Sequence, residues 1–256
     1  MAPPTYHDEW DEIVARFIAA KEPFPGYWAR SENFALELID PSIRSRRGRL
    51  LDLGCGVGRL LVRYAGWFDE VVGIEADSFR IAKAAANVWN AGLTNVRFIN
   101  APFEGCVGLG EFDVVLCSHV IQHLSVEAVK PIMQRIHATL VPGGMIILLT
   151  AHSRCNSDSF KIWRASSTAC ETEVAADEFH RILADDRRKN ALPIHAFGLP
   201  GLRRLLTEYE LLRVHCFHAL GPRNLSDAIL FRDRWINWPF LQGGFGNDVL
   251  VAGQKV

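Results

Sequence analysis

Short apolar runs alternate with helical patterns through the middle of the chain. The helical patterns are amphipathic or rich in alanine, and they lie at 57–68, 78–91 and 125–140. Apolar runs of strand length flank and separate them, at 49–53, 70–74, 95–100, 112–117 and 145–150. Strands that alternate with helices in this way form parallel sheets with right-handed crossovers. The pattern therefore predicts an α/β fold with a doubly wound, mostly parallel sheet.

The alternation stops after Thr150. Residues 171–190 follow a helical pattern that begins with acids and ends with bases, an order that complements the helix dipole. A further helix is predicted at 198–209. Strands at 211–219 and 248–252 bring the predicted sheet to seven strands.

Two long segments, 152–197 and 220–246, interrupt the alternating core. Connections of this length inside a compact domain are usually functional or disordered, so we expect both to be lids over a site. Their aromatic side chains predict either an apolar pocket or a satellite core: Phe160, Trp163, Phe179, Phe231, Trp235, Trp238 and Phe240.

The same patterns divide the chain into four predicted parts. A helical cap at 1–48 contains an amphipathic pattern at 11–20, and the alternating core follows at 49–151. A helical lid insertion is predicted at 152–197. The last helix and strands lie within 198–256, where the second insertion interrupts them at 220–246.

Composition and charge argue against several classes of function. The 28 basic and 29 acidic residues give 28 − 29 = −1, a balance without general attraction to nucleic acid or anionic membranes. No apolar stretch approaches the roughly 20 residues that span a bilayer, and residues 1–10 carry no signal-peptide pattern. The six cysteines form no CxxC pair, which predicts reduced thiols, no metal site and a cytoplasmic location.

The most specific signal is the segment LLDLGCGVGR at 50–59. An apolar strand leads into Gly54, Gly56 and Gly58, and then into a helix. Glycines let the backbone approach a ligand closely, and the helix N-terminus presents free N–H groups. A dinucleotide-binding loop has the spacing G-x-G-x-x-G, whereas the third glycine here comes one residue earlier. This spacing disfavours a nicotinamide cofactor.

Two acids accompany the loop. Asp52 precedes it, where a carboxylate favours a cationic group such as an ammonium or a sulfonium. Glu75 ends the second strand, about 20 residues further on, where acids accept hydrogen bonds from ribose hydroxyls. S-adenosylmethionine combines a ribose, an adenine, an ammonium and a positive sulfur, so these residues predict that it is the cofactor.

At these residues the sequence resembles the class I S-adenosylmethionine-dependent methyltransferases. The likeness rests on four motifs within 49–151, which are LLDLGCGVGRLL, VVGIEAD, EFDVVLCSHVIQHL and LVPGGMIILLT. It implies the Rossmann-like methyltransferase fold, with the backbone of Gly54, Cys55, Gly56 and Gly58 forming the loop that faces the methionyl part of the cofactor.

The resemblance also assigns side chains to parts of the cofactor. It implies that Asp52 supports the ammonium and that Glu75 binds the ribose hydroxyls, with Ala76 packed on adenine. Arg59 stands where a subgroup that includes protein N-terminal methyltransferases places an arginine on the cofactor carboxylate. A guanidinium pairs well with a carboxylate, and an exposed first-turn arginine is the alternative.

One stretch departs from the family pattern. Many members carry an aspartate after the third strand that holds the adenine amino group, and Pro102 stands near that position here. The backbone of Phe103 or the carboxylate of Glu104 is the expected replacement. Ser118, at the end of the fourth strand, is a further expected cofactor contact.

His119 and His123 follow the fourth strand, at the sheet edge where ligands bind in open α/β folds. A histidine can take the proton of a hydroxyl or ammonium as it is methylated, so both residues are candidate catalytic bases. The resemblance adds that a histidine matching His123 serves near the acceptor amine in N-terminal protein methyltransferases. A structural histidine that bonds a loop carbonyl is the other interpretation of His123.

The sequence thus predicts a methyltransferase that acts on the oxygen or nitrogen of a small molecule, with no nucleic-acid or membrane partner. A protein or peptide N-methyltransferase is one alternative, indicated by Arg59 and the HVIQHL stretch. A cofactor-binding module without catalysis is the other. Oxygen and nitrogen acceptors, and any oligomeric state, fit the sequence equally.

Overall fold

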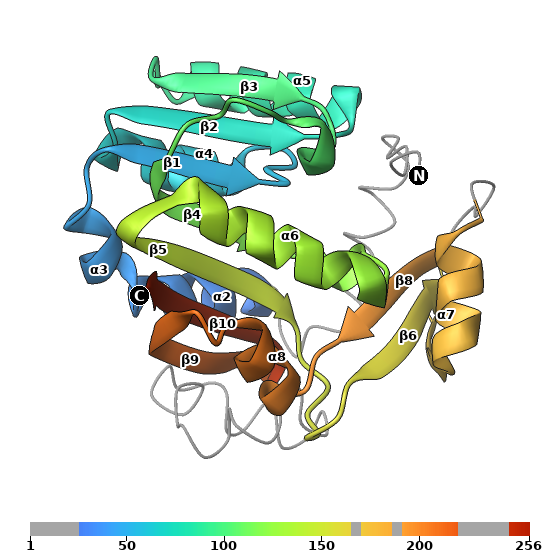
Figure 1. Cartoon of the computed structure of the whole chain (residues 1–256). Helices are drawn as coiled ribbons and strands as arrows, with labels where there is room; N and C mark the ends of the chain where they lie inside the picture. The colour runs from blue at the N-terminus through green and yellow to red at the C-terminus, as the bar shows by residue number, and fades with distance from the viewer. Residues whose placement is uncertain (1–25, 165–169, 186–190, 220–245) are drawn as a thin grey trace.

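A seven-stranded sheet forms the centre of the computed structural model, which describes residues 26–164, 170–185, 191–219 and 246–256 (Figure 1). Its strand order is β3-β2-β1-β4-β5-β10-β9. The strands are β1 (Arg49–Leu53), β2 (Glu70–Glu75), β3 (Val96–Asn100), β4 (Phe112–Ser118), β5 (Leu140–Ala151), β9 (Tyr209–Ala219) and β10 (Gly246–Lys255). The first five are parallel, and β10 pairs antiparallel with β5 and β9. The predicted doubly wound, mostly parallel sheet is confirmed.

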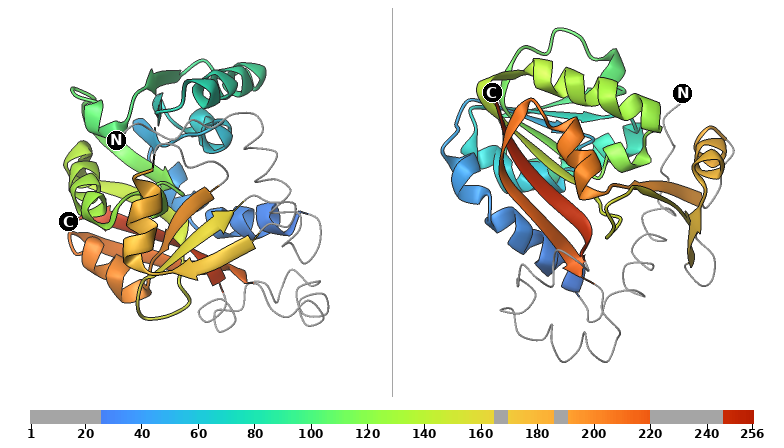
Figure 2. Two further views of the ribbon diagram at one scale, coloured as in Figure 1. Left: turned by 90° about the vertical axis from the view of Figure 1, so that its right-hand side faces the viewer. Right: turned by 60° about the horizontal axis from the view of Figure 1, so that its bottom comes forward.

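Helices cover both faces of the sheet (Figures 1 and 2). The α-helices of this layer are α2 (Tyr27–Glu37), α3 (Asp40–Arg44), α4 (Arg59–Tyr64), α5 (Ser78–Asn90), α6 (Val126–Thr139) and α8 (Leu199–Leu205). Short 3-10 turns are η1 (Ala65–Trp67), η2 (Phe103–Gly105) and η3 (Ile121–His123). Side-chain caps fix two helix starts, because Asp77 accepts from the backbone of Phe79 and Arg80, and Ser125 from that of Ala128.

The alternation of side chains along each strand divides the core into two clusters. Leu51 and Leu53 of β1 pack in the cluster that α6 and α8 cover. Leu50 packs in the other cluster, which α2 and α4 cover. Because both faces of the sheet are buried, the inner strands are continuous hydrophobic runs in the sequence.

The first insertion differs from the prediction of a helical lid. It forms an antiparallel sheet of β6 (Ser159–Arg164), β7 (Cys170–Val174) and β8 (Ala191–Ala196), together with one helix, α7 (Ala176–Leu183). The helix predicted at 171–190 is therefore correct only over α7. Two of the acids that suggest a first helical turn, Glu171 and Glu173, lie on β7, where Glu171 forms a 3.0 Å ion pair with Lys161 of β6, whereas Asp177 and Glu178 do begin α7. Cross-strand pairing thus outweighs the helical pattern in this segment.

The aromatic residues of this insertion form a satellite core. The rings of Phe160 and Phe179 lie 5.0 Å apart, Phe160 stacks on His195 at 4.8 Å, and Trp163 is buried. The insertion leaves the main sheet after β5 and projects beside its edge (Figure 2). The helix predicted at 11–20 and the aromatics predicted within 220–246, from Phe231 to Phe240, lie outside the described residues.

The carboxyl ends of β1, β4 and β5 lie at the same edge of the sheet as the start of β10 and the end of β9. The strand registers place Asp248 opposite Ala151 and Phe217, which brings β5, β9 and β10 together there. Ligands of open α/β sheets bind outside such an edge. Among the helices that the structure describes, none has the length and apolar character needed to cross a membrane.

Candidate active site

The glycine loop at the end of β1 is shaped by close packing. Gly54, Gly56 and Gly58 all have positive φ angles, of 71°, 53° and 81°. A Cβ atom at Gly54 would collide with the side chain of Val120, and one at Gly58 would lie 3.1 Å from Cβ of Ala84. Glycine therefore lets the loop pack against the segment after β4 on one side and against α5 on the other.

Glu75 is held by this loop. Its Oε2 accepts from the Gly56 N–H at 2.9 Å, and its Oε1 accepts from the Asp77 N–H at 3.0 Å. Asn100 supports the same corner, because its Nδ2 donates to the carbonyl oxygens of Glu75 and Ala76 at 2.9 and 3.1 Å. These bonds fix a buried carboxylate at the end of β2, which is the position predicted for ribose binding.

Asp52 is the most deeply buried acid of the site. Its side chain is 1% exposed, and its Oδ2 has no hydrogen-bond partner among the described residues. Burial raises the pKa of Asp52 to about 7. The positive charge of Arg59 lowers this pKa, and the negative charge of Glu75 raises it, but both effects are smaller than that of burial. A buried carboxylate without a partner is costly, and a cationic ligand group compensates it. This orphaned oxygen fits the ammonium that the sequence predicts there.

Arg59 begins α4 and pairs with α2. Its Nη2 lies 2.7 Å from Oε1 of Glu32, whose side chain is 11% exposed, whereas the arginine side chain is 52% exposed. Sequence patterns give no signal for Glu32, because it precedes Arg59 by 27 residues and lies on a separate helix. The guanidinium keeps further N–H donors, so a ligand carboxylate and Glu32 can bind to it together.

The other predicted cofactor contacts lie around the loop. Pro102 is exposed and precedes η2, and the ring of Phe103 packs in the core beneath the Arg135 guanidinium, which is 4.7 Å from the ring centre. Phe103 thus offers its backbone to a ligand and keeps its ring in the core. Ser118 ends β4 opposite Leu149 of β5, at the same edge as the loop.

Cys55 lies within the glycine loop and is buried. Burial raises the pKa of its thiol, and the neighbouring Asp52 and Glu75 carboxylates raise it further. The thiol is therefore protonated at neutral pH, so Cys55 contributes its backbone and volume. Among the described residues, no group of three or more histidine, cysteine or acidic side chains is arranged to hold a metal ion.

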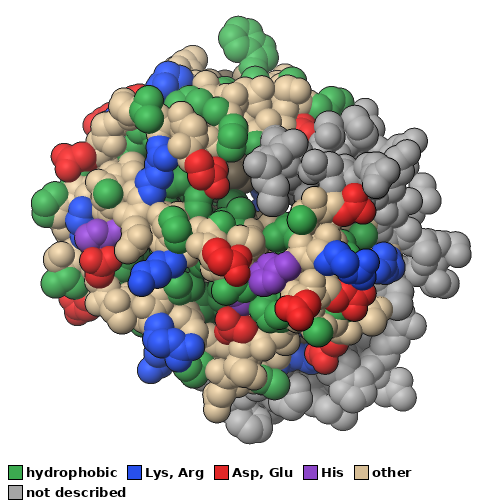
Figure 3. Space-filling model, turned by 45° about the vertical axis from the view of Figure 1, so that its right-hand side comes forward, with side chains coloured by type: hydrophobic (Ala, Val, Ile, Leu, Met, Phe, Trp, Pro, Cys, Tyr) green, Lys and Arg blue, Asp and Glu red, His purple; other side chains and the backbone are tan. Residues whose placement is uncertain are grey.

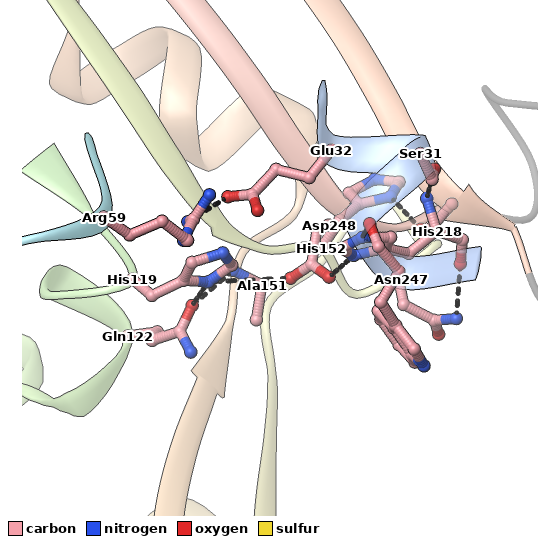
Figure 4. Close-up of polar contacts among 12 residues, drawn as sticks. Ser31, Glu32, Arg59, His119, Gln122, Ala151, His152, His218, Asn247 and Asp248 are labelled. Atoms are coloured by element: carbon pink, nitrogen blue, oxygen red, sulfur yellow. Dashed lines mark hydrogen bonds and ion pairs between the residues drawn. The ribbon is translucent and has the colours of Figure 1, made fainter. Parts of the chain in front are cut away.

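His119 follows β4 with a φ of 55°, and its backbone N–H donates to Leu149 at 2.8 Å. Its Nδ1 lies 3.1 Å from Oε1 of Gln122, and that oxygen also accepts from the Ala151 N–H at 2.8 Å. Because the amide oxygen accepts from both, Nδ1 of His119 carries the proton. The contacts of His119 within the described structure leave Nε2 as an acceptor (Figure 4).

His123 has a different environment. Its Nδ1 lies 2.9 Å from the carbonyl oxygen of Pro193 in β8, and its Nε2 lies 3.2 Å from Nε2 of Gln122. Since the carbonyl accepts only, Nδ1 donates and Nε2 receives the amide proton. Both ring nitrogens thus link η3 to neighbouring groups, and this geometry favours the structural interpretation of His123.

A group of polar residues at the same edge, shown in Figure 4, has no signal in the sequence patterns. His218 ends β9 with a φ of 56°, and its Nδ1 lies 2.6 Å from Oδ2 of Asp248. Its Nε2 lies 2.9 Å from the Trp28 carbonyl oxygen, and its backbone N–H donates to Ser31 Oγ at 3.0 Å. These residues come from both ends of the chain, and only the antiparallel pairing of β9 with β10 brings His218 and Asp248 together.

Asp248 lies between two histidines. Burial opposes its ionisation, but the hydrogen bond with His218 and the nearby His119 and Lys161 outweigh burial and lower the pKa of Asp248. Its Oδ1 is 3.9 Å from Nδ1 of His119. Nδ1 of a neighbouring histidine, His152, donates to the Gly246 carbonyl oxygen at 2.9 Å, and burial lowers the pKa of His152.

The site therefore has two adjoining parts. The glycine loop presents backbone and two buried acids, and the segment after β4 presents His119 beside Asp248. Val120, the residue after His119, packs directly on Gly54 and joins the two parts.

A cavity of about 330 Å³ lies elsewhere, between α6 and α8, and none of the predicted site residues lines it. On the face shown in Figure 3, acidic and basic side chains of the described residues are interspersed, without a continuous basic patch.

Comparison with known proteins adds independent evidence. The family described as "Methyltransferase domain" matches residues 50–144. An uncharacterized RNA methyltransferase of Thermosynechococcus vestitus is 36% identical over 97 residues, which cover 37% of this chain and 22% of that protein. A ubiquinone biosynthesis O-methyltransferase of a Bradyrhizobium species is 28% identical over 148 residues, covering 54% and 57%. The chain thus spans less than two thirds of either curated relative.

The fold is shared with a solved structure. An S-adenosylmethionine-dependent methyltransferase from Clostridium acetobutylicum superposes with a TM-score of 0.61, covering 97% of this chain and 99% of that one. Its sequence is 11% identical, so the likeness concerns the fold.

Proposed function

The chain belongs to the class I S-adenosylmethionine-dependent methyltransferase family, and from this premise we propose that it transfers a methyl group from S-adenosylmethionine to the oxygen or nitrogen of a small molecule. The observation that carries the proposal is the pair of buried carboxylates beside the glycine loop. Glu75 is fixed by two backbone N–H groups, and Asp52 keeps a buried oxygen without a partner. Together they suit a ligand with ribose hydroxyls at one end and an ammonium at the other.

The residues around the glycine loop each have a role in this proposal. Asp52 offsets the ammonium charge, and Arg59 holds the cofactor carboxylate while it keeps its pair with Glu32. Glu75 accepts from the ribose hydroxyls. Ala76, Pro102 and the Phe103 backbone border the adenine, and Ser118 borders the cofactor at the end of β4.

The bound cofactor supplies a methyl group that is already activated by the positive sulfur. The protein's contribution is therefore alignment of the acceptor, exclusion of water and removal of a proton. His119 is the proposed base, because its Nε2 keeps a lone pair. His123 has both ring nitrogens engaged by Pro193 and Gln122, so we assign it a structural role in the same segment.

Several observations support a small-molecule acceptor. The net charge of −1 provides no general attraction to nucleic acid, and the RNA methyltransferase relative is matched over only 22% of its length. The relative named as a ubiquinone biosynthesis O-methyltransferase is matched over more of both chains. The two features that favour a peptide acceptor, Arg59 and His123, each have a partner within the protein.

Calorimetry with three ligands tests the cofactor part of this proposal. S-adenosylmethionine and its demethylated product S-adenosylhomocysteine should both bind, and NAD should not. Binding of NAD without binding of S-adenosylmethionine would overturn the proposal. Methyl transfer itself is tested by release of S-adenosylhomocysteine in the presence of candidate acceptors.

A further inference from the structure

We propose that Asp248 is a positioning residue that makes His119 a general base, and that the acceptor is a weakly acidic hydroxyl group. The inference rests on the proposed methyl-transfer function and deepens it. It assigns the residue behind the base and the class of acceptor that needs such a base.

The first observation is the backbone conformation of two histidines. His119 and His218 have φ angles of 55° and 56°, in the left-handed region that residues other than glycine seldom adopt. Specific hydrogen bonds hold both, from the His119 N–H to Leu149 and from the His218 N–H to Ser31 Oγ. Strained residues of this kind cluster at functional sites. Here both direct their rings toward one carboxylate, that of Asp248 (Figure 4).

The second observation is the division of roles between the two carboxylate oxygens. Oδ2 of Asp248 accepts from Nδ1 of His218 at 2.6 Å, and His218 is itself anchored on the Trp28 carbonyl oxygen at 2.9 Å. This chain of bonds fixes the carboxylate. Oδ1 then lies 3.9 Å from Nδ1 of His119, where its negative charge stabilises the imidazolium formed when Nε2 takes a proton.

The third observation is the tautomer of His119. Gln122 Oε1 receives the Ala151 N–H, so its bond with Nδ1 of His119 requires the proton on Nδ1. The lone pair is consequently on Nε2, the atom that a base needs. Gln122 of η3 and Asp248 of β10 both approach Nδ1 of His119, at 3.1 and 3.9 Å.

The position of His119 matches this role. Its neighbour Val120 occupies the space that the missing side chain of Gly54 leaves, so the base is built onto the loop that faces the cofactor. The ring is about one-third exposed, which leaves it accessible to an acceptor. The base and the methyl donor thus border the same edge of the sheet.

A base of this kind favours oxygen over nitrogen. A neutral amine attacks with its own lone pair and can lose its proton afterwards, whereas a weakly acidic hydroxyl becomes a good nucleophile as its proton leaves. In the proposed step, the hydroxyl proton passes to Nε2 of His119 while an oxygen lone pair forms a bond to the methyl carbon. The carbon–sulfur bond breaks, and its electron pair stays on sulfur. The products are a methyl ether and S-adenosylhomocysteine, and the imidazolium later releases its proton to water.

Methyl transfer from labelled S-adenosylmethionine to phenol, to the more acidic 4-nitrophenol and to aniline tests the step. With phenol, His119→Ala should lower the rate by about 10²–10⁴-fold, the range expected for a positioned base. With 4-nitrophenol the loss should be much smaller, because that hydroxyl ionises more easily. Equal losses with both phenols, or methylation of aniline and of neither phenol, would overturn the proposal. So would methylation of no phenol by wild-type protein that binds the cofactor.

Asp248→Asn tests the positioning role, since the amide can still accept from His218. The variant should be slower with phenol, and the acidic limb of its pH–rate profile should move to lower pH because the carboxylate no longer stabilises the imidazolium. The other titratable groups around this carboxylate, His218 of β9 and Lys161 of β6, are still present in the variant. Glu127→Gln is the matched control, since it removes a carboxylate 3.8 Å from a different histidine, His180.

A magnetic resonance titration gives a readout that needs no acceptor. In the complex with S-adenosylhomocysteine, the ring C2 proton signal that His119→Ala removes should titrate at lower pH in Asp248→Asn and should be unmoved in Glu127→Gln. An unmoved signal in Asp248→Asn overturns the positioning role. Failure of the underlying function has a different signature, namely absence of S-adenosylhomocysteine binding by the wild-type protein.

Discussion

The guanidinium of Arg59 is paired with a carboxylate from the N-terminal part of the chain, at 2.7 Å between Nη2 and Oε1 of Glu32. The arginine opens α4 directly after the glycine loop, and the glutamate lies on α2. The pair therefore joins α2 to the loop that faces the proposed cofactor. The carboxylate of Glu32 thus lies beside the guanidinium that the cofactor carboxylate would also approach. Both carboxylates would accept hydrogen bonds from the N–H groups of Arg59.

This arrangement yields a prediction for Arg59→Ala. Affinity for S-adenosylhomocysteine should fall roughly 3- to 30-fold (about 0.7–2 kcal/mol), as expected for a charge-assisted pair on a half-exposed arginine. Affinity for 5′-methylthioadenosine, which lacks the amino-acid part, should be unchanged. Calorimetry with both ligands checks this. An equal loss for both ligands would mean that Arg59 acts through the fold of the loop and not on the carboxylate.

Glu75→Ala should weaken both ligands, because both carry the ribose. The expected loss is roughly 1–3 kcal/mol, which corresponds to about 5- to 150-fold in the dissociation constant. Glu70→Ala is the matched control, since Glu70 begins the same strand and pairs with Arg49 at 2.7 Å, away from the loop. Unchanged affinity in Glu75→Ala, measured by calorimetry on folded protein, would exclude Glu75 as the ribose ligand.

Asp52 should make the ligand-free protein less stable as pH rises. Burial raises its folded-state pKa from 3.8 to about 7, so the folded protein holds this proton where the unfolded chain has lost it. Stability from this group is present below about pH 4 and is lost as pH rises to about 7, by an upper bound of roughly 4 kcal/mol. Urea unfolding of wild type and Asp52→Asn over this range should show the decline only in the wild type.

The same variant separates the parts of the cofactor. Asp52→Asn should weaken S-adenosylhomocysteine, which carries the ammonium, and leave 5′-methylthioadenosine unchanged. A pH-dependent decline that is equal in both proteins would show that other groups titrate. In that case the pKa of Asp52 would not be raised in the folded protein.

The main sheet could be predicted from the sequence because each of its first strands is marked by residues that are neighbours in the chain. The strands β1 to β5 are short apolar runs bounded by glycine, polar or capping residues, and Ser125 caps α6 as its position before an amphipathic run predicts. The first insertion is the exception. Its acidic segment at 171–174 resembles a helix start in isolation, but it pairs with β6 as a strand, and the ion pair between Glu171 and Lys161 is part of that pairing.

The site divides in the same way. Asp52, the glycines and Glu75 lie within one β-α-β unit, so their spacing in the sequence reflects their proximity. Glu32, His218 and Asp248 come from separate parts of the chain, and no spacing connects them to His119 or Arg59. Their roles depend on the antiparallel strands at the sheet edge and on the packing of α2, which are consequences of tertiary structure.

The variant His123→Ala tests whether His123, in the segment after β4, has a structural or a catalytic role. Because His123 bridges Gln122 and the Pro193 carbonyl oxygen, its removal leaves buried polar groups unpaired and detaches η3 from β8. The expected cost is roughly 1–3 kcal/mol, or a fall of several degrees in melting temperature for a chain of this size. Affinity for S-adenosylhomocysteine and turnover per folded molecule should remain near those of the wild type, since Nε2 of His119 is untouched. His180→Ala, at a histidine of α7, is the control for the loss of a ring. A normal melting temperature combined with a loss of turnover would reverse the assignment and make His123 the base.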